Sequence, residues 1–182
     1  MPISADSYTV VETKVMLDHP WVKMVVDTLE HHGKRLKHFY LASPVEAAAV
    51  VALTGDGQII RTRQYRHPVG AVIYDLPAGR LEPGEHPLAG ARRELEEETG
   101  YRAGRIEKLG YYNQFPGTLR AATSIFLATD LTQTEQKLDE GEELEVVRMP
   151  FAEALAMVLR GECVDGSLQL GVLLAAQKGL AR

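Results

Sequence analysis

The segment from Gly79 to Tyr101, GRLEPGEHPLAGARRELEEETGY, constrains the fold more than any other part of the chain. A loop punctuated by Gly and Pro leads here into a short run with helical spacing. At about 100° per residue, Leu88, Ala91 and Leu95 fall on one stripe of such a helix. The sequence therefore predicts a helix that packs this apolar stripe into the core.

Three carboxylates occupy a second face of the same helix. Glu94, Glu97 and Glu98 fall within about one third of the circumference, whereas Glu96 points away from both faces. Like charges at this spacing destabilise an isolated helix by roughly 0.2–0.5 kcal/mol per pair. Oxygen-rich clusters suit hard cations such as Mg²⁺ or Mn²⁺, which complete their shell with water and substrate phosphate. The face is therefore either a metal site or a solvated acidic surface.

The spacing of individual residues favours the metal site. Gly79 is followed by five residues, Glu85, seven more residues, and then RELEEETGY from Arg93 to Tyr101. This order resembles the signature of the Nudix hydrolase family, G-x5-E-x7-R-E-U-x-E-E-x-G-U, in which U is aliphatic. Tyr101 is the sole departure from this signature, because it stands where the family usually has an aliphatic residue. That position has a packing role, which an aromatic side chain can also fill. The resemblance implies a loop-helix-loop that binds divalent metal and cleaves a nucleoside diphosphate linked to another moiety.

The resemblance also implies roles for individual residues. Glu94 and Glu98 are the expected ligands of Mg²⁺, with Mn²⁺ as an alternative, and Glu97 is a shared or second ligand. The backbone carbonyl of Ala78, just before the loop, is expected to bind the metal as well. Glu85 lies on the far side of the helical wheel, where we expect it to brace the loop through an ion pair with the neighbouring arginine of the motif.

A general base must lie close to the attacking water. One source is the helix itself, through Glu97 or Glu98. The other is the acidic loop, DEGEE at positions 139–143, in which Glu140 and Glu142 are candidates. In the ADP-ribose and nucleotide-sugar pyrophosphatases that this chain resembles, a glutamate of such a loop closes over the metals. Both sources stay open, as does a purely solvated loop.

Residues outside the motif bear on the substrate. Pro116 lies sixteen residues after the last glycine of the motif and marks the ADP-ribose pyrophosphatase branch of the resembled family. The next residue, Gly117, permits close backbone approach to a ligand. Relatives often carry an acidic residue soon after this pair, whereas this chain has TLRA at 118–121, which leaves room for other nucleotide sugars.

Two arginines and the only tryptophan complete the candidate substrate site. Arg66 and Arg80 are predicted phosphate ligands because a guanidinium presents paired donors to phosphate oxygens. A surface salt bridge is the alternative for Arg66. Trp21 is a candidate to stack on a nucleobase, or to pack at a dimer interface.

The order of the remaining elements, strands first and helices later, predicts an α+β fold with a mixed sheet. A hairpin is expected around TGDG at 54–57, and two closing helices over 151–160 and 167–178. The resemblance sharpens this to the Nudix α/β/α sandwich, with a Nudix hydrolase domain over 45–182. Residues 1–44 form a strand-rich extension, which in similar members builds a homodimer. An extra edge hairpin on a monomer is the alternative.

Composition excludes several classes of protein. A net charge of −5 gives no basic surface for polymeric nucleic acid, and the single Cys163 excludes an intramolecular disulfide. No stretch of about 18 apolar residues predicts a membrane span, so we expect a cytoplasmic protein. The expected reaction is Mg²⁺-dependent hydrolysis of ADP-ribose or related nucleoside diphosphate sugars. A Nudix enzyme for nucleoside triphosphates or dinucleoside polyphosphates, and a nucleotide-sugar sensor without catalysis, are the alternatives.

Overall fold

The computed structural model describes residues 4–180, which divide into two compact units. The first unit contains the N-terminal residues up to Val45 together with Asn113–Ala121, and the second contains Glu46–Tyr112 and the chain from Ala122 onward. The segment 113–121, which carries Pro116 and Gly117, thus belongs to the first unit. It joins this unit through strand pairing with residues more than 70 positions away in sequence, Leu41 with Leu119 and Ala42 with Arg120.

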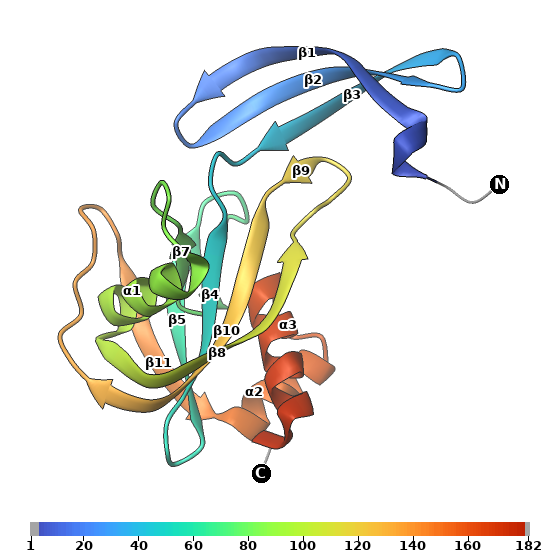
Figure 1. Ribbon diagram of the computed structural model, residues 1–182. Helices are drawn as coiled ribbons and strands as arrows, with labels where there is room; N and C mark the ends of the chain where they lie inside the picture. The colour runs from blue at the N-terminus through green and yellow to red at the C-terminus, as the bar shows by residue number, and fades with distance from the viewer. Residues whose placement is uncertain (1–3, 181–182) are drawn as a thin grey trace. The chain divides into compact units, whose positions relative to one another are not determined.

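A small sheet makes up most of the first unit (Figure 1). Its strand order is β1-β2-β3-β9, in which β1 and β3 pair antiparallel with β2, and β9 pairs parallel with β3. The described part of the chain begins with a short 3-10 helix at Ala5–Ser7. The strands are β1 Tyr8–His19, β2 Val22–His31, β3 Lys34–Ala42 and β9 Leu119–Arg120.

The sheet of the second unit has the order β11-β5-β4-β10-β8, with β6 beside β5 and β7 beside β4. β4 pairs antiparallel with β5 around the predicted turn at 54–57 and parallel with β10, so the predicted mixed sheet is confirmed. The short strands β6, β7 and β9 were not predicted. The strands are β4 Ala47–Leu53, β5 Gln58–Arg66, β6 Ala71–Asp75, β7 Ala78–Arg80, β8 Tyr101–Asn113, β10 Ala122–Gln133 and β11 Leu144–Pro150.

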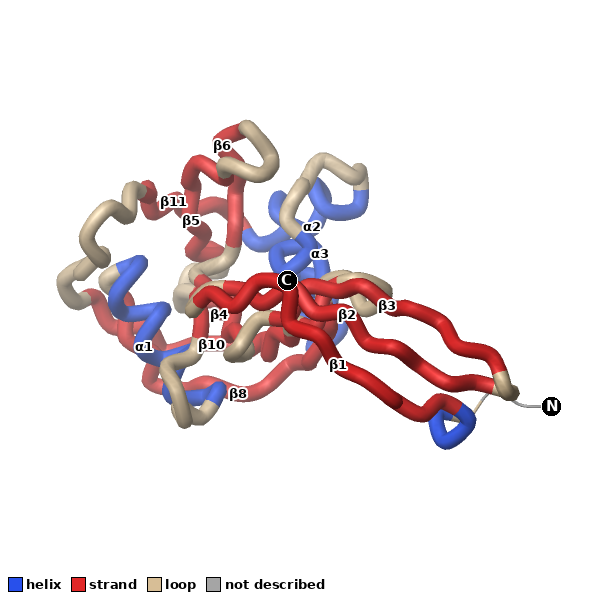
Figure 2. Tube along the Cα trace, turned by 90° about the horizontal axis from the view of Figure 1, so that it is seen from above, coloured by secondary structure: helices blue, strands red, loops and turns tan. Residues whose placement is uncertain are grey.

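Helices cover both faces of this sheet (Figures 1 and 2). α1 (Pro87–Thr99) packs on one face, and α2 (Phe151–Leu159) and α3 (Gly166–Ala175) pack on the other. Side chains of β4 alternate between the two cores, with Val50 in the α1 core and Val51 in the α2/α3 core. The chain then continues into a π-helical turn, Ala176–Leu180. The predicted α/β/α sandwich is confirmed.

Local chemistry sets the ends of α1. His86 caps the N-terminus by accepting a hydrogen bond from the backbone N–H of Leu88 at 3.3 Å, and Pro87 follows at the first helical position. Gly100 ends the helix with φ 65°, a left-handed conformation that favours glycine. Ala91 and Leu95 are fully buried in the core, as the apolar stripe predicts. The carboxylate face is thereby fixed in orientation.

Over residues 4–180, the structure contains no helix that is both long and apolar enough to cross a membrane.

The core beneath α3 offers a matched test of packing. Leu168→Ala should lower the free energy of unfolding by about 2–5 kcal/mol, because Leu168 is 1 % exposed and its removal leaves a cavity. Leu159→Ala, at a residue that is 71 % exposed at the end of α2, should change it by less than about 0.5 kcal/mol. Urea unfolding monitored by circular dichroism measures both. Equal losses in the two variants would contradict this packing.

Candidate active site

Arg93 of α1 connects the loop of the motif to the acidic face of the helix. Its Nε and Nη2 donate to the two carboxylate oxygens of Glu85, both at 3.0 Å, and Nη2 also donates to the carbonyl of Arg80 at 3.1 Å. Its Nη1 lies 2.8 Å from Oε1 of Glu94 and 3.0 Å from Oε2 of Glu97. Hydrogen bonding to Arg93 lowers the pKa of Glu85. The predicted ion pair that braces the loop is confirmed.

Glu98 is the most deeply buried carboxylate of the helix, at 5 % exposure. Its Oε2 accepts a hydrogen bond from the backbone N–H of Ala78 at 2.8 Å. Burial, aided by the charges of Glu94 and Glu142, raises the pKa of Glu98 to about 8, against the opposing effects of the Ala78 N–H and Arg66. An ionised Glu98 is therefore costly unless a further positive charge stabilises it.

Glu94 lies against the backbone of β7. A Cβ atom added at Gly79 would lie 2.2 Å from its carboxyl carbon, so a larger residue there would displace this carboxylate. Burial raises the pKa of Glu94, and the charges of Glu97 and Glu142 raise it further, while Arg93 opposes them. Glu94 and Glu98 thus both lie against the start of β7, at Gly79 and Ala78 respectively.

This donor set fits a hard divalent cation. Several carboxylates raise one another's pKa here, and such repulsion is what bound Mg²⁺ relieves. Among residues 4–180, no three His, Cys, Asp or Glu side chains lie close enough to hold a metal by themselves. Mg²⁺ needs only one or two protein carboxylates and retains several waters, so Glu94 and Glu98 suffice. Metal binding by Glu94, Glu97, Glu98 and the carbonyl of Ala78 stays a prediction.

The segment that leads into the acidic loop is tied to the C-terminal end of α1. Gln136 donates from its side-chain Nε2 to the carbonyl of Glu98 at 2.7 Å, and Lys137 donates from its backbone N–H to the carbonyl of Glu97 at 2.8 Å. These bonds satisfy carbonyls that lack partners within the helix. The sequence does not predict this contact of Gln136, because an isolated Gln in a polar segment gives no signal of a specific contact.

The acidic loop extends from this anchor. Glu142 is near enough to Glu94 and Glu98 for its charge to raise the pKa of both, and its own carboxylate accepts a hydrogen bond from the backbone N–H of Asp139 at 3.1 Å. Glu140 is exposed and makes no hydrogen bond or ion pair within the described chain. Of the two loop candidates, Glu142 is the one that acts electrostatically on the helix carboxylates.

Arg66 lines a cavity of about 730 Å³ together with residues of the acidic loop. Its guanidinium forms an ion pair with Asp75, at 2.7 Å from Nε to Oδ2. The alternative of a salt bridge is therefore correct for one edge of Arg66, although its partner is buried rather than on the surface. The cavity is lined by Arg63, Gln64, Tyr65, Arg66, Val72, Gly141, Glu142, Glu143, Leu144 and Glu145.

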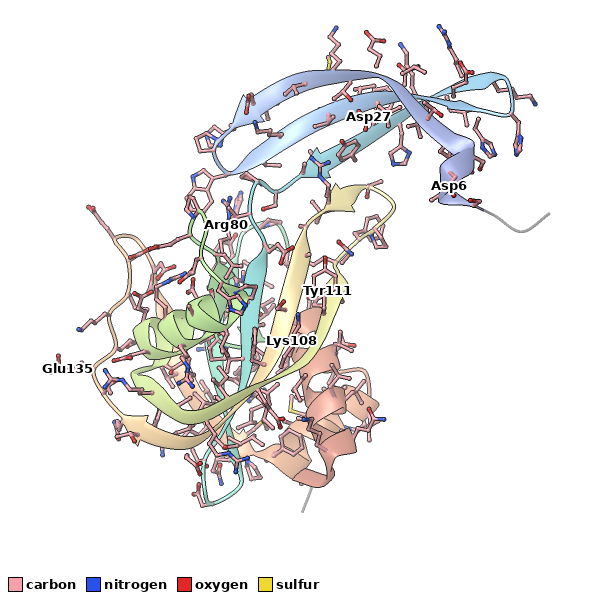
Figure 3. The ribbon with its side chains drawn as sticks, viewed as in Figure 1. Asp6, Asp27, Arg80, Lys108, Tyr111 and Glu135 are labelled. Atoms are coloured by element: carbon pink, nitrogen blue, oxygen red, sulfur yellow. The ribbon has the colours of Figure 1, made fainter. Side chains whose placement is uncertain are left out.

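The remaining substrate-binding candidates are not among the residues that line this cavity. Arg80 ends β7, and Figure 3 shows its side chain in the second unit. Trp21, which is 67 % exposed, and Gly117 belong to the first unit. A substrate-binding role for these three residues stays a prediction.

The buried carboxylate of Glu98 predicts a distinctive pH dependence. Folded Glu98 keeps its proton up to about pH 8, whereas a glutamic acid in the unfolded chain loses it near pH 4.3. The native state then binds more protons between these values, so the unfolding free energy of the chelator-treated protein should fall as pH rises from about 5 to 8. Glu98→Gln has no proton to lose and should flatten this slope.

Glu135→Gln is the matched control for this measurement, because Glu135 is exposed on the loop after β10 (Figure 3). Urea unfolding of the three proteins at several pH values, with chelator present throughout, gives the slopes. A Glu98→Gln slope equal to that of the control would contradict the burial of this carboxylate.

Comparisons with known proteins agree with this geometry. Residues 43–163 match the family model described as "NUDIX domain". The chain is 40 % identical to an ADP-ribose pyrophosphatase of Bacillus subtilis, over 81 % of this chain and 84 % of that protein. It is 33 % identical to a methanol dehydrogenase activator of Bacillus methanolicus, over 89 % of each.

A solved structure titled "Crystal structure of ADP compounds hydrolase" shares the fold over 100 % of both chains, with a TM-score of 0.87 at 23 % identity. The family match spans most of the chain, and within it lies the acidic helix with its bracing arginine. The protein belongs to the Nudix family and is a pyrophosphatase hydrolase.

Proposed function

We propose that this enzyme is a Mg²⁺-dependent pyrophosphatase that hydrolyses ADP-ribose or related nucleoside diphosphate sugars to a nucleoside monophosphate and a sugar phosphate. The observation that carries the proposal is the pair formed by partly buried Glu94 and buried Glu98, held against β7 within reach of the charge of Glu142. The 40 % identity to a protein named ADP-ribose pyrophosphatase supports the choice of substrate.

Each residue of the site has a task in this reaction. Bound Mg²⁺ would neutralise phosphate charge and lower the pKa of a water molecule. The backbone N–H of Ala78 keeps Glu98 oriented, and the contact with Gly79 keeps Glu94 in place. Arg93 holds the loop and the helix as one rigid element, which preserves the geometry that the reaction needs.

A carboxylate must also accept a proton from the attacking water. Glu142 is our first choice, because its charge already acts on the helix carboxylates and its neighbour Gly141 has φ 88°, which permits a turn next to it. Glu97, Glu98 and Glu140 are the other candidates. Arg66 and Arg80 would bind the phosphates, and Trp21 and Gly117 would contact the nucleoside.

A substrate panel tests this proposal. With Mg²⁺, the protein should release a nucleoside monophosphate from ADP-ribose, GDP-mannose or UDP-glucose faster than it cleaves ATP, and chelator should abolish turnover. Glu98→Gln should lower kcat by about 100-fold or more, because a metal carboxylate is lost, without unfolding the protein. Chromatography of the products and circular dichroism give the two readouts. Cleavage of ATP alone would refute the proposal, and binding without turnover would favour the sensor.

We further propose that the enzyme is a homodimer built through its N-terminal unit. β1 is an edge strand, and all twelve of its residues are exposed in the single chain. They include Val10, Val15, Met16 and Leu17, which are 47–55 % exposed. An apolar edge strand of this length invites pairing or aggregation unless another chain covers it. A second copy of the chain is the partner that the resembled family suggests.

Charges placed on β1 should therefore dissociate the dimer. The double variant Val15→Lys/Leu17→Lys is expected to weaken dimerisation by about tenfold or more, because it buries two cations in the interface. Val164→Lys, at a residue that is 62 % exposed in the second unit, is the matched control and should remain dimeric. Sedimentation velocity over a concentration series measures both. A monomeric wild-type protein would refute the dimer.

A further inference from the structure

Asp75 is a buried acid that no pattern in the sequence indicates. It ends β6, pairs with Thr62 of β5 and is 3 % exposed. Its Oδ2 lies 2.7 Å from Nε and 2.5 Å from Nη2 of Arg66. Its Oδ1 is buried and accepts no hydrogen bond from residues 4–180. Because a buried carboxylate is costly without a cation, Asp75 depends on this single arginine.

The contact leaves Arg66 in a defined position. Two of its three side-chain nitrogens are held by one oxygen, and Nη1 makes no hydrogen bond within the described chain. The side chain is 42 % exposed and lines the cavity that Glu142 also lines. One edge of the guanidinium is thus fixed to a buried acid, while the residue itself borders an open cavity.

Other acids compete for the same guanidinium. The charge of Arg66 acts on Glu98 in α1 and on Asp165, the residue that caps α3 through a 2.6 Å bond from the backbone N–H of Leu168 to its Oδ1. Neither acid has a hydrogen bond to Arg66 among residues 4–180, whereas Asp75 does. Without Asp75, the arginine would be free to pair with one of these neighbours.

We propose that Asp75 is a positioning residue, which holds Arg66 so that its remaining edge binds a phosphate oxygen of a nucleoside diphosphate in the cavity. The inference rests on the proposed function, because it supplies Arg66 with its ligand. A guanidinium fixed along one edge loses little freedom when it binds an oxyanion. Asp75 therefore acts on the substrate only through Arg66.

A double-mutant cycle tests this dependence. The four proteins are the wild type, Asp75→Asn, Arg66→Ala and the double variant. Asp75→Asn retains the shape of the side chain and should lower kcat/KM for ADP-ribose about tenfold. In the Arg66→Ala background the same substitution should change kcat/KM by less than about twofold, because Asp75 acts on the substrate only through Arg66. Asp56→Asn, in the exposed turn between β4 and β5, is the matched control and should be fully active.

The result that overturns the inference is an equal loss from Asp75→Asn in both backgrounds, which would identify a purely structural role. Thermal unfolding of the four proteins accompanies the cycle, so a loss of fold is seen directly. The same four proteins are compared by their Kd for ADP, measured by calorimetry with Mg²⁺. Asp75→Asn is expected to weaken ADP binding about tenfold when Arg66 is present and to leave it unchanged in the Arg66→Ala background.

Binding of ADP separates this inference from the proposed function. If the wild type binds ADP and the two residues are coupled, the positioning role holds even when no nucleoside diphosphate sugar is cleaved. If the wild type does not bind ADP, or Asp75→Asn binds it equally well, the positioning role is wrong whatever the enzyme hydrolyses.

Discussion

Two carboxylates beside the backbone of β7, one buried and one partly buried, are the constraint on which the candidate site depends. Burial of Glu94 and Glu98 disfavours their charged forms, and the charge of Glu142 makes both harder to ionise. The protein offsets this only in part, through the backbone N–H of Ala78 and the guanidinium of Arg93. A site that is left short of positive charge in this way is suited to bind a divalent cation and the phosphates that accompany it.

Arg93 can serve this site because its donors form a planar fork. Nε and Nη2 engage both oxygens of Glu85, which leaves Nη1 for the carboxylates of Glu94 and Glu97. A lysine could reach one of these groups but could not keep the loop and the helix in one fixed relation. The motif therefore needs arginine for geometry as much as for charge.

Patterns with a clear period were predictable from the sequence. The apolar stripe of α1 follows from helical spacing, and the β4–β5 hairpin follows from Asp-Gly between two apolar runs. The short strands carry too few residues for a period of two to appear, as in the three residues of β7. Gln136 and Asp75 were not predicted, because each owes its role to partners 38 and 9 residues away that only the folded chain brings into contact.

Glu98 links two parts of the site that the sequence treats as separate. Its carboxylate accepts a hydrogen bond from Ala78 in β7, while its carbonyl accepts one from Gln136 at the base of the acidic loop. The base of the loop is therefore bonded to the last turn of α1, the turn that carries the carboxylate lying deepest in the site. Glu142 extends from the same loop, and its charge raises the pKa of Glu98. The acidic loop therefore acts on Glu98 in two ways, through a hydrogen bond to its carbonyl and through charge on its carboxylate.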